Sequence, residues 1–358
     1  MLLAVHHSVH RAGGPNPRHR MTHRVKPQSV LTLLCTLVLV GCTPGTDPLK
    51  TPLTEQGNIQ LPAPPAEAGP GSLDLLTLDT RNGLLYVPYS STLDIIDVHT
   101  RKLKGQVPNL PGIKSIALSA DPNIVFTADG GNNRVAVVDV AKLKITDEIV
   151  TPVGNPDAIV FDPINNQVIV AQTGPSPNVA FIDVATHKVV ATLKLAASPE
   201  LMTIDTRAGR VFLAIHDKDA VVAIDVASRQ ITSTYKGCDI KTPIGIAYDP
   251  DQGRLFVANG IPHSANVLSA IDVVLDRCLG SIDIGHGPDQ AAFNEHLHHV
   301  YVANSGTSTV SVIDTVSLKP LGTNGTGHAS HSVTVDPTTD LVYVGVERAG
   351  IIAVYHDP

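Results

Sequence analysis

The chain has 358 residues, with 26 basic and 33 acidic side chains and a formal net charge of −7. Because an acidic surface repels phosphate backbones, we expect no nucleic-acid partner. The four cysteines form no Cys-x-x-Cys pair and no Cys-x-x-Cys-His motif, which excludes covalently attached haem.

Residues 1 to 42 have the pattern of a targeting segment. From Met21 a short basic start leads into an apolar stretch that ends in LVGC, residues 39 to 42. This pattern resembles a bacterial lipoprotein signal, in which the Cys thiol receives diacylglycerol. The apolar run is about half of the roughly 20 residues that span a bilayer, so a membrane helix fits less well. The resemblance implies lipidation at Cys42 and leaves Met1 and Met21 open as start sites.

With Thr rather than Asp at position 43, the resemblance further implies an outer-membrane lipoprotein that faces the periplasm or the exported surface. Residues 43 to 56, TPGTDPLKTPLTEQ, are rich in Pro and Thr and predict a tether between the lipid and the folded part. Without a leader that holds five basic residues and no acidic one, 21 basic side chains remain against 33 acidic ones, a net charge of −12.

Residues 57 to 358 repeat a single pattern. YVANSGTSTVSVID at 301 to 314 returns as FTADGGNNRVAVVD at 126 to 139. The closing Asp recurs every 42 to 47 residues, at Asp97, Asp139, Asp183, Asp225, Asp272 and Asp314. Each unit has about four short runs of β-branched and aromatic residues between turn residues. Seven such units predict an all-β, seven-bladed β-propeller, in which the repeated Asp caps a turn and is not catalytic.

The two ends of the repeat predict how the ring closes. The seventh unit stops after its third strand, IIAVYHDP at 351 to 358, while GNIQLPAP at 57 to 64 aligns with the fourth-strand segment ATLKLAAS at 191 to 198. We therefore expect an N-terminal strand to complete the last blade and to remove its exposed edge. Cys238 and Cys278 fall at opposite ends of neighbouring outer strands, which disfavours a disulfide between them without excluding it.

YVAN at 301 to 304 and VSVID at 310 to 314, repeated along the chain, resemble the YVTN-type β-propeller family over residues 57 to 358. Trp, and with it the Trp-Asp pair of WD40 blades, is absent, which argues against that other class. Relatives in the YVTN-type family include surface-layer proteins, lactonase-like proteins, streptogramin lyases and propeller domains of haem and copper enzymes. The resemblance thus implies an architecture and leaves the activity open.

The face where the inner strands begin is the expected functional surface, because loops from all blades converge there. One position per unit, two residues before the first core residue, should lie at the channel mouth: Asp74, Lys114, Asp157, Glu200, Ile244, Asp289 and His331. Crowded titratable groups are typical of ligand sites, although solvated loop residues would show the same composition.

Histidines extend this candidate site. His286 and His328 occupy one position in successive blades, three residues before the mouth position, while His216 and His263 fall in loops between second and third strands that should share this face. Imidazoles beside carboxylates suit Zn²⁺ or Cu²⁺, with His286, His328 and His331 as the candidate ligands, and suit acid–base chemistry equally. No His-x-x-x-His spacing occurs after the leader to support a metal, so no cofactor is assigned. A separate trio, His296, His298 and His299, should lie solvated on the opposite face.

Two classes of function remain open. The first is a monomeric binding lipoprotein that presents this face to a periplasmic protein, a metal ion or a small ligand. The second is a lactonase-like hydrolase or lyase in which a divalent ion polarises a carbonyl and a His moves the proton. No lactonase or lyase motif matches beyond the repeat, and no Gly-x-Ser-x-Gly element occurs, so catalytic residues are not assigned. Because one propeller frame hosts many functions, we favour the binding protein.

Overall fold

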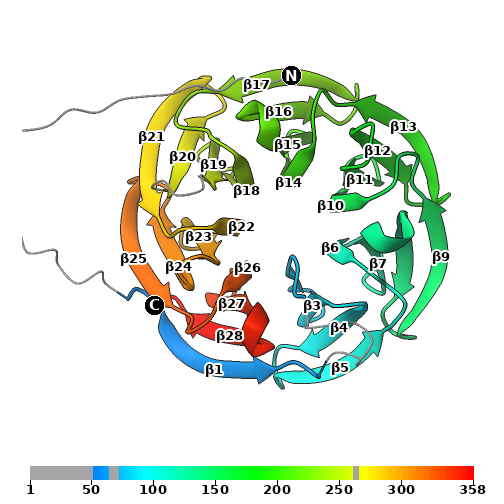
Figure 1. Ribbon diagram of the computed structural model, residues 1–358, viewed down its shortest axis with the longest axis horizontal. Helices are drawn as coiled ribbons and strands as arrows, with labels where there is room; N and C mark the ends of the chain where they lie inside the picture. The colour runs from blue at the N-terminus through cyan, green and yellow to red at the C-terminus, as the bar shows by residue number, and fades with distance from the viewer. Residues whose placement is uncertain (1–50, 64–71, 261–265) are drawn as a thin grey trace, which may run out of the picture. The chain divides into compact units, whose positions relative to one another are not determined.

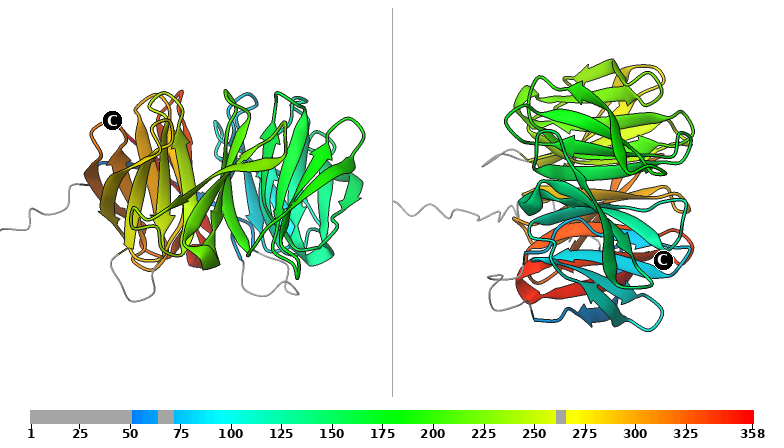
Figure 2. Two further views of the ribbon diagram at one scale, coloured as in Figure 1. Left: turned by 90° about the horizontal axis from the view of Figure 1, so that it is seen from above. Right: turned by 90° about the vertical axis from the view of Figure 1, so that its right-hand side faces the viewer.

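The computed structural model describes residues 51–63, 72–260 and 266–358. Seven four-stranded antiparallel sheets stand in a ring around a central axis (Figure 1), which confirms the predicted seven-bladed propeller. Edge-on, the connecting turns gather at the two faces of the ring (Figure 2). The leader with Cys42, most of the predicted tether and His263 lie outside the described residues. No helix within the described ranges is both long and apolar enough to cross a membrane.

Six blades are built from four consecutive strands, ordered from the axis outward. Blades 1 to 3 contain β2 (Thr77–Asp79), β3 (Leu84–Tyr89), β4 (Thr92–Asp97) and β5 (Lys102–Val107); β6 (Ile113–Ala117), β7 (Ile124–Asp129), β8 (Arg134–Asp139) and β9 (Lys144–Val150); and β10 (Pro156–Asp162), β11 (Gln167–Gln172), β12 (Asn178–Asp183) and β13 (Lys188–Lys194). Blades 4 to 6 contain β14 (Pro199–Asp205), β15 (Arg210–Ile215), β16 (Ala220–Asp225) and β17 (Gln230–Lys236); β18 (Pro243–Asp249), β19 (Arg254–Asn259), β20 (Asn266–Asp272) and β21 (Arg277–Ile284); and β22 (Pro288–Asn294), β23 (His299–Asn304), β24 (Thr309–Asp314) and β25 (Lys319–Gly325). Blade 7 contains β26 (Ser330–Asp336), β27 (Leu341–Val346), β28 (Ile351–His356) and, on the outside, β1 (Thr54–Gln60).

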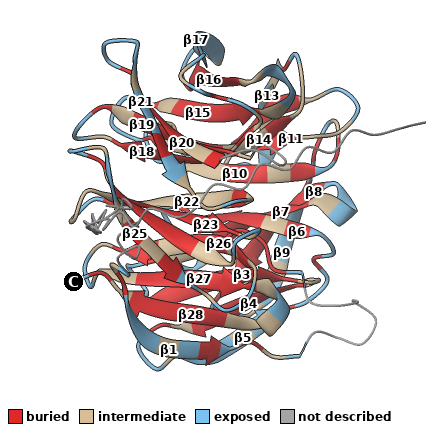
Figure 3. Cartoon of the chain, turned by 60° about the vertical axis from the view of Figure 1, so that its left-hand side comes forward, coloured by how far each residue is buried: buried red, intermediate tan, exposed pale blue. Residues whose placement is uncertain are grey.

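The middle strands of each blade are buried on both faces, because neighbouring blades cover them (Figure 3). They therefore read as continuous apolar runs, whereas the outer strand β13 alternates between exposed and half-buried residues. The third residue of the second strand is a fully buried aromatic ring in six blades: Tyr86, Phe126, Phe212, Phe256, Tyr301 and Tyr343. Blade 3 has Ile169 there, and its register partner Phe181 supplies the ring instead.

The predicted closure of the ring is confirmed. β1 pairs antiparallel with β28, with Ile59 opposite Ile352, and places the two ends of the described chain in one sheet. The strand begins at Thr54, three residues before the predicted start, so the last residues of the predicted tether belong to the sheet. Just ahead of it, the side-chain amide of Asn324 in blade 6 accepts from the backbone N–H of Leu53 and donates to its carbonyl.

The repeated Asp caps a turn in every blade where it occurs, as predicted. In blade 3, for example, Asp183 Oδ1 accepts the backbone N–H of Thr186 at 2.8 Å. The carboxylates of Asp97, Asp139, Asp225, Asp272 and Asp314 likewise accept the backbone N–H three residues on. These acidic groups are therefore accounted for by the turns of the fold.

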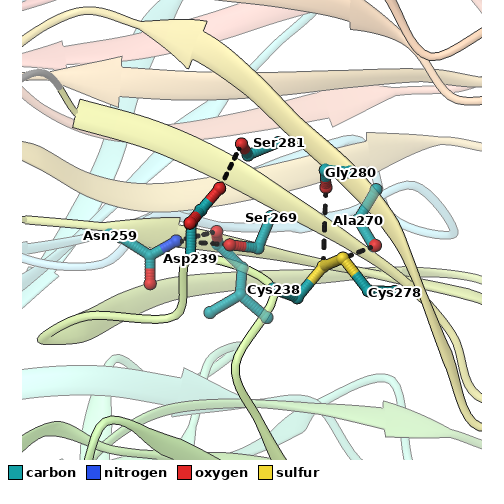
Figure 4. Close-up of a disulfide and its surroundings, with 9 residues drawn as sticks. Cys238, Asp239, Asn259, Ser269, Ala270, Cys278, Gly280 and Ser281 are labelled. Atoms are coloured by element: carbon teal, nitrogen blue, oxygen red, sulfur yellow. Dashed lines mark hydrogen bonds between the residues drawn. A yellow bond between two sulfur atoms is a disulfide. The ribbon is translucent and has the colours of Figure 1, made fainter.

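The expectation that Cys238 and Cys278 lie too far apart on neighbouring outer strands to form a disulfide is wrong. The two cysteines form a disulfide between blades 4 and 5, with Cα atoms 5.3 Å apart (Figure 4). Each strand of a blade is rotated relative to its neighbour, so the outer strands lie nearly end to end along the rim (Figure 1). The end of β17 thus meets the start of β21. At the junction of blades 2 and 3, His187 Nδ1, just before β13, lies 2.6 Å from Asp147 Oδ2 in the middle of β9.

The expected solvation of the histidine trio holds for His296, whose side chain is 63% exposed, and is wrong for His298 and His299. Each ring of the β22–β23 hairpin faces an aspartate of a neighbouring blade: His296 Nδ1 lies 3.0 Å from Asp340, His298 Nδ1 3.3 Å from Asp249, and His299 Nδ1 2.7 Å from Asp357. Asp357 is buried and also accepts the hydroxyl of Tyr301 at 2.5 Å. Blades 5 and 7 therefore hold the blade 6 hairpin through carboxylates, which the hairpin sequence alone does not reveal.

We expect His299→Ala to lower the free energy of unfolding by about 2 kcal/mol, because it removes one of the two hydrogen-bond partners of Oδ2 in the buried Asp357 carboxylate. His296→Ala is the matched control, since that side chain is 63% exposed and its pair should contribute less than about 1 kcal/mol. Urea titration of both variants measures the difference. Equal losses would mean that burial does not distinguish the two pairs.

Candidate functional site

A common irregularity of the inner strands positions the predicted channel-mouth residues. The first residue of each inner strand pairs with the end of the second strand, as Pro156 does with Gln172, and the ladder then shifts register. The same shift follows Ile113, Pro199, Pro243, Pro288 and Ser330. Such bulges re-aim the next side chain. That side chain belongs to Lys114, Asp157, Glu200, Ile244, Asp289 or His331, and Asp74 follows the equivalent bridge of Leu73.

These seven positions form what we call the channel-mouth ring. Lys114 Nζ lies 2.9 Å from Asp74 Oδ2, and His331 Nε2 lies 3.1 Å from Asp289 Oδ2. His216, from the loop after β15, approaches Glu200 with 3.9 Å between Nδ1 and Oε1. The side chains of Glu200 and Asp289 remain 34% and 24% exposed, so the ring is accessible from this face.

The ring carries more negative than positive charge. Burial, reinforced by Asp157 and the other ring carboxylates, raises the pKa of Glu200 to about 7. Burial also raises the pKa of Asp289 to about 6, although His331 opposes this, and it raises the pKa values of Asp74 and Asp157. Burial acts to lower the pKa of Lys114, but the carboxylates around it outweigh that effect and the net shift is upward. Four carboxyl groups thus share one lysine.

The channel beneath the ring is narrow. A cavity of about 90 Å³, lined mainly by inner-strand side chains such as Ile116, Ile159 and Met202, holds only about three waters at ~30 Å³ each. A ligand must therefore approach the ring from its face.

Sequence reasoning did not single out Gln290, the residue after Asp289. Its Oε1 accepts the backbone N–H groups of Leu76 and Val333, and its Nε2 donates to the carbonyl of Leu76, so one amide joins the inner strands of blades 6, 7 and 1. The sequence feature that could have identified Gln290 is its long polar side chain, at a position where the other blades have only small or apolar residues.

His286 and His328 do not join the ring. The backbone carbonyl of His286 accepts from Gly306, and that of His328 accepts from Thr326, but neither imidazole is in contact with a ring carboxylate. Within the described ranges, no group of three or more His, Cys, Asp and Glu side chains is arranged to hold a metal ion. The donor set of His286, His328 and His331 therefore does not fit a metal, and His263 lies outside the described residues.

Comparison with known proteins supports the fold but identifies no family. No family model and no curated protein matches the sequence. Many solved structures match the architecture. One is the Kuenenia stuttgartiensis hydrazine synthase, which aligns over 88% of this chain and 98% of that chain with a TM-score of 0.70 and 15% identity. Identity at that level shows a shared seven-bladed frame alone, so the YVTN-type resemblance stays an interpretation of the sequence.

Proposed function

We propose that this chain is a lipid-anchored binding protein of the cell envelope whose channel-mouth ring binds a primary ammonium group of its ligand. The anchor and the periplasmic location rest on the LVGC sequence at residues 39 to 42. The ring supports the binding role, because four partly desolvated carboxyl groups share one lysine at an accessible face. An ammonium group placed among them would favour their charged forms and so oppose the burial and mutual repulsion that raise the pKa values of Glu200 and Asp289.

The excess of carboxyl groups in the ring, on which this proposal rests, also indicates a positively charged ligand. A primary amine brings one positive charge and three N–H donors, which match carboxylate oxygens. Anions would meet the same repulsion that the ring carboxylates already exert on one another. We therefore use putrescine as the probe, with 1,4-butanediol as an uncharged probe of equal length.

We expect Glu200→Gln to weaken putrescine binding and to stabilise the protein by about 1 kcal/mol at pH 8. The folded pKa of about 7 exceeds the ordinary 4.5, so the contribution of Glu200 to stability is fully present below pH 4.5 and is lost as pH rises through 7. The figure is discounted because the side chain is about one-third exposed. Calorimetric titration and urea unfolding at pH 4 and pH 8 check both effects.

Glu295→Gln, an exposed carboxylate on the opposite face, is the matched control and should change neither quantity. Putrescine binding by the wild-type protein should also weaken as pH falls from 8 to 5.5, because Glu200 and then Asp289 become protonated. A destabilised Glu200→Gln protein that still binds putrescine would assign this carboxylate to the framework instead.

A hydrolase or lyase is the second candidate, and one observation favours it. His331 Nε2 contacts Asp289, while its buried Nδ1 has no hydrogen-bond partner among the described residues. Such a dyad, beside carboxyl groups with raised pKa values, has the parts of a proton relay. A catalyst would open a simple lactone with a bell-shaped pH profile that His331→Ala abolishes, whereas a binding protein would show no turnover.

A further inference from the structure

A groove on the outer rim separates blades 3 and 4. It encloses about 230 Å³, and its floor consists of the apolar side chains of Leu195, Ile215, Ala220 and Val222, all buried. Ile231 of β17 forms its edge and is 43% exposed. β13 and β17 are neighbouring arcs of the rim in Figure 1. We call this space the rim groove.

The strand register orders the groove along its length. Lys236 pairs with Ala220, Thr234 with Val222, and Ile231 with Ile224, so these side chains share the face of the sheet that is turned toward blade 3. Lys218 precedes Ala220 by two residues and also lines the groove. Both lysines therefore stand at one end, and the apolar side chains continue toward the other end.

The ammonium groups of Lys218 and Lys236 are available to bind an anion. Both are exposed, and neither takes part in an ion pair within the part of the chain that the structure describes. The acidic neighbours of Lys218 form no ion pair with it: Asp219 accepts Lys241 Nζ at 2.7 Å, and Asp217 is exposed. In a chain of net charge −7, two unpaired ammonium groups at the head of an apolar groove form a complementary site for an anionic amphiphile.

We propose that the rim groove binds a free medium-chain alkyl carboxylate. The carboxylate contacts Lys218 and Lys236, and the chain lies along Val222 and Ile231. The groove is smaller than the roughly 300–1,000 Å³ of typical small-molecule sites, which suits an unbranched chain of moderate length. This site does not rest on the proposed function of the channel-mouth ring, for which we propose a ligand of the opposite charge.

Calorimetric titration of the purified chain with hexanoate, octanoate and decanoate tests the apolar half of the site. Affinity should rise about fourfold per methylene that enters the groove. Decanoate should bind at least tenfold more tightly than uncharged decanol. The double variant Lys218→Gln/Lys236→Gln should lose this preference, and Ala220→Leu, which fills the groove, should weaken both ligands at least tenfold.

Lys188→Gln, an exposed lysine at the start of β13, is the matched control and should bind like the wild-type protein. Should Ala220→Leu not fold, decanoate should still protect Lys218 and Lys236 of the wild-type protein from acetylation by acetic anhydride while Lys188 reacts. No saturable decanoate binding, equal affinity for decanol, or an unchanged double variant would overturn the site. So would binding to phosphatidylglycerol vesicles that decanoate does not compete with.

Discussion

A chain that begins at residue 61 is expected to lose cooperative unfolding and to aggregate. It lacks β1, the outer strand of blade 7, so the edge of β28 and its row of unpaired backbone groups become exposed. The deletion also uncovers the blade 7 core beneath Ile59, which is only 2% exposed. Since domains of this kind are stable by only about 5–15 kcal/mol, losing one whole strand removes a large part of that margin.

A single substitution in β1 tests the role of the closing strand without shortening the chain. Ile59→Asp should lower the free energy of unfolding by about 4 kcal/mol, because it places an unpaired carboxylate in the cluster around Leu85 and Ile352. Asn58→Asp, an exposed position of the same strand, should change it by less than about 0.5 kcal/mol. Size-exclusion chromatography and urea unfolding measure both effects, with a chain beginning at residue 51 as the reference. A monomeric chain from residue 61 with an unchanged midpoint would show that the ring needs no closing strand.

The architecture was predictable because each blade repeats the same local solution. Asp183 caps its turn with atoms from three residues away, and the buried ring of Tyr301 lies within a run that reads as a strand by itself. The channel-mouth positions followed from the same repetition. Once the first core residue of each unit was aligned, Asp289 and His331 had to fall at equivalent points of adjacent blades.

Contacts between blades were not predictable in the same way. The rotation of successive strands decides which ends meet at the rim, and no local pattern records it, so the Cys238–Cys278 bond was disfavoured. The pairing of His299 with Asp357 joins residues 58 positions apart for the same reason. The raised pKa of Glu200 sums burial and several charges from different blades, which composition cannot supply.

Replacing both cysteines by serine is expected to lower the free energy of unfolding by about 4 kcal/mol. The bond closes a loop with a sequence separation of 40, and such a closure restricts the unfolded chain by about that amount. It also ties the last turn of blade 4 to the outer strand of blade 5, where the remaining cross-link is weak. That link is the hydrogen bond from Ser281 to Asp239 at 2.7 Å, both exposed.

Differential scanning calorimetry should therefore show a fall of roughly 6 °C in Tm for the double variant. Ser281→Ala, at the same junction, is the matched control and should fall by less than about 2 °C. Because Cys278 is exposed, dithiothreitol should reproduce the loss in the wild-type protein and have no effect on the double variant. If the reductant and the substitutions both leave Tm unchanged, the junction of blades 4 and 5 is held by packing around Phe212 and Tyr248 rather than by the covalent bond.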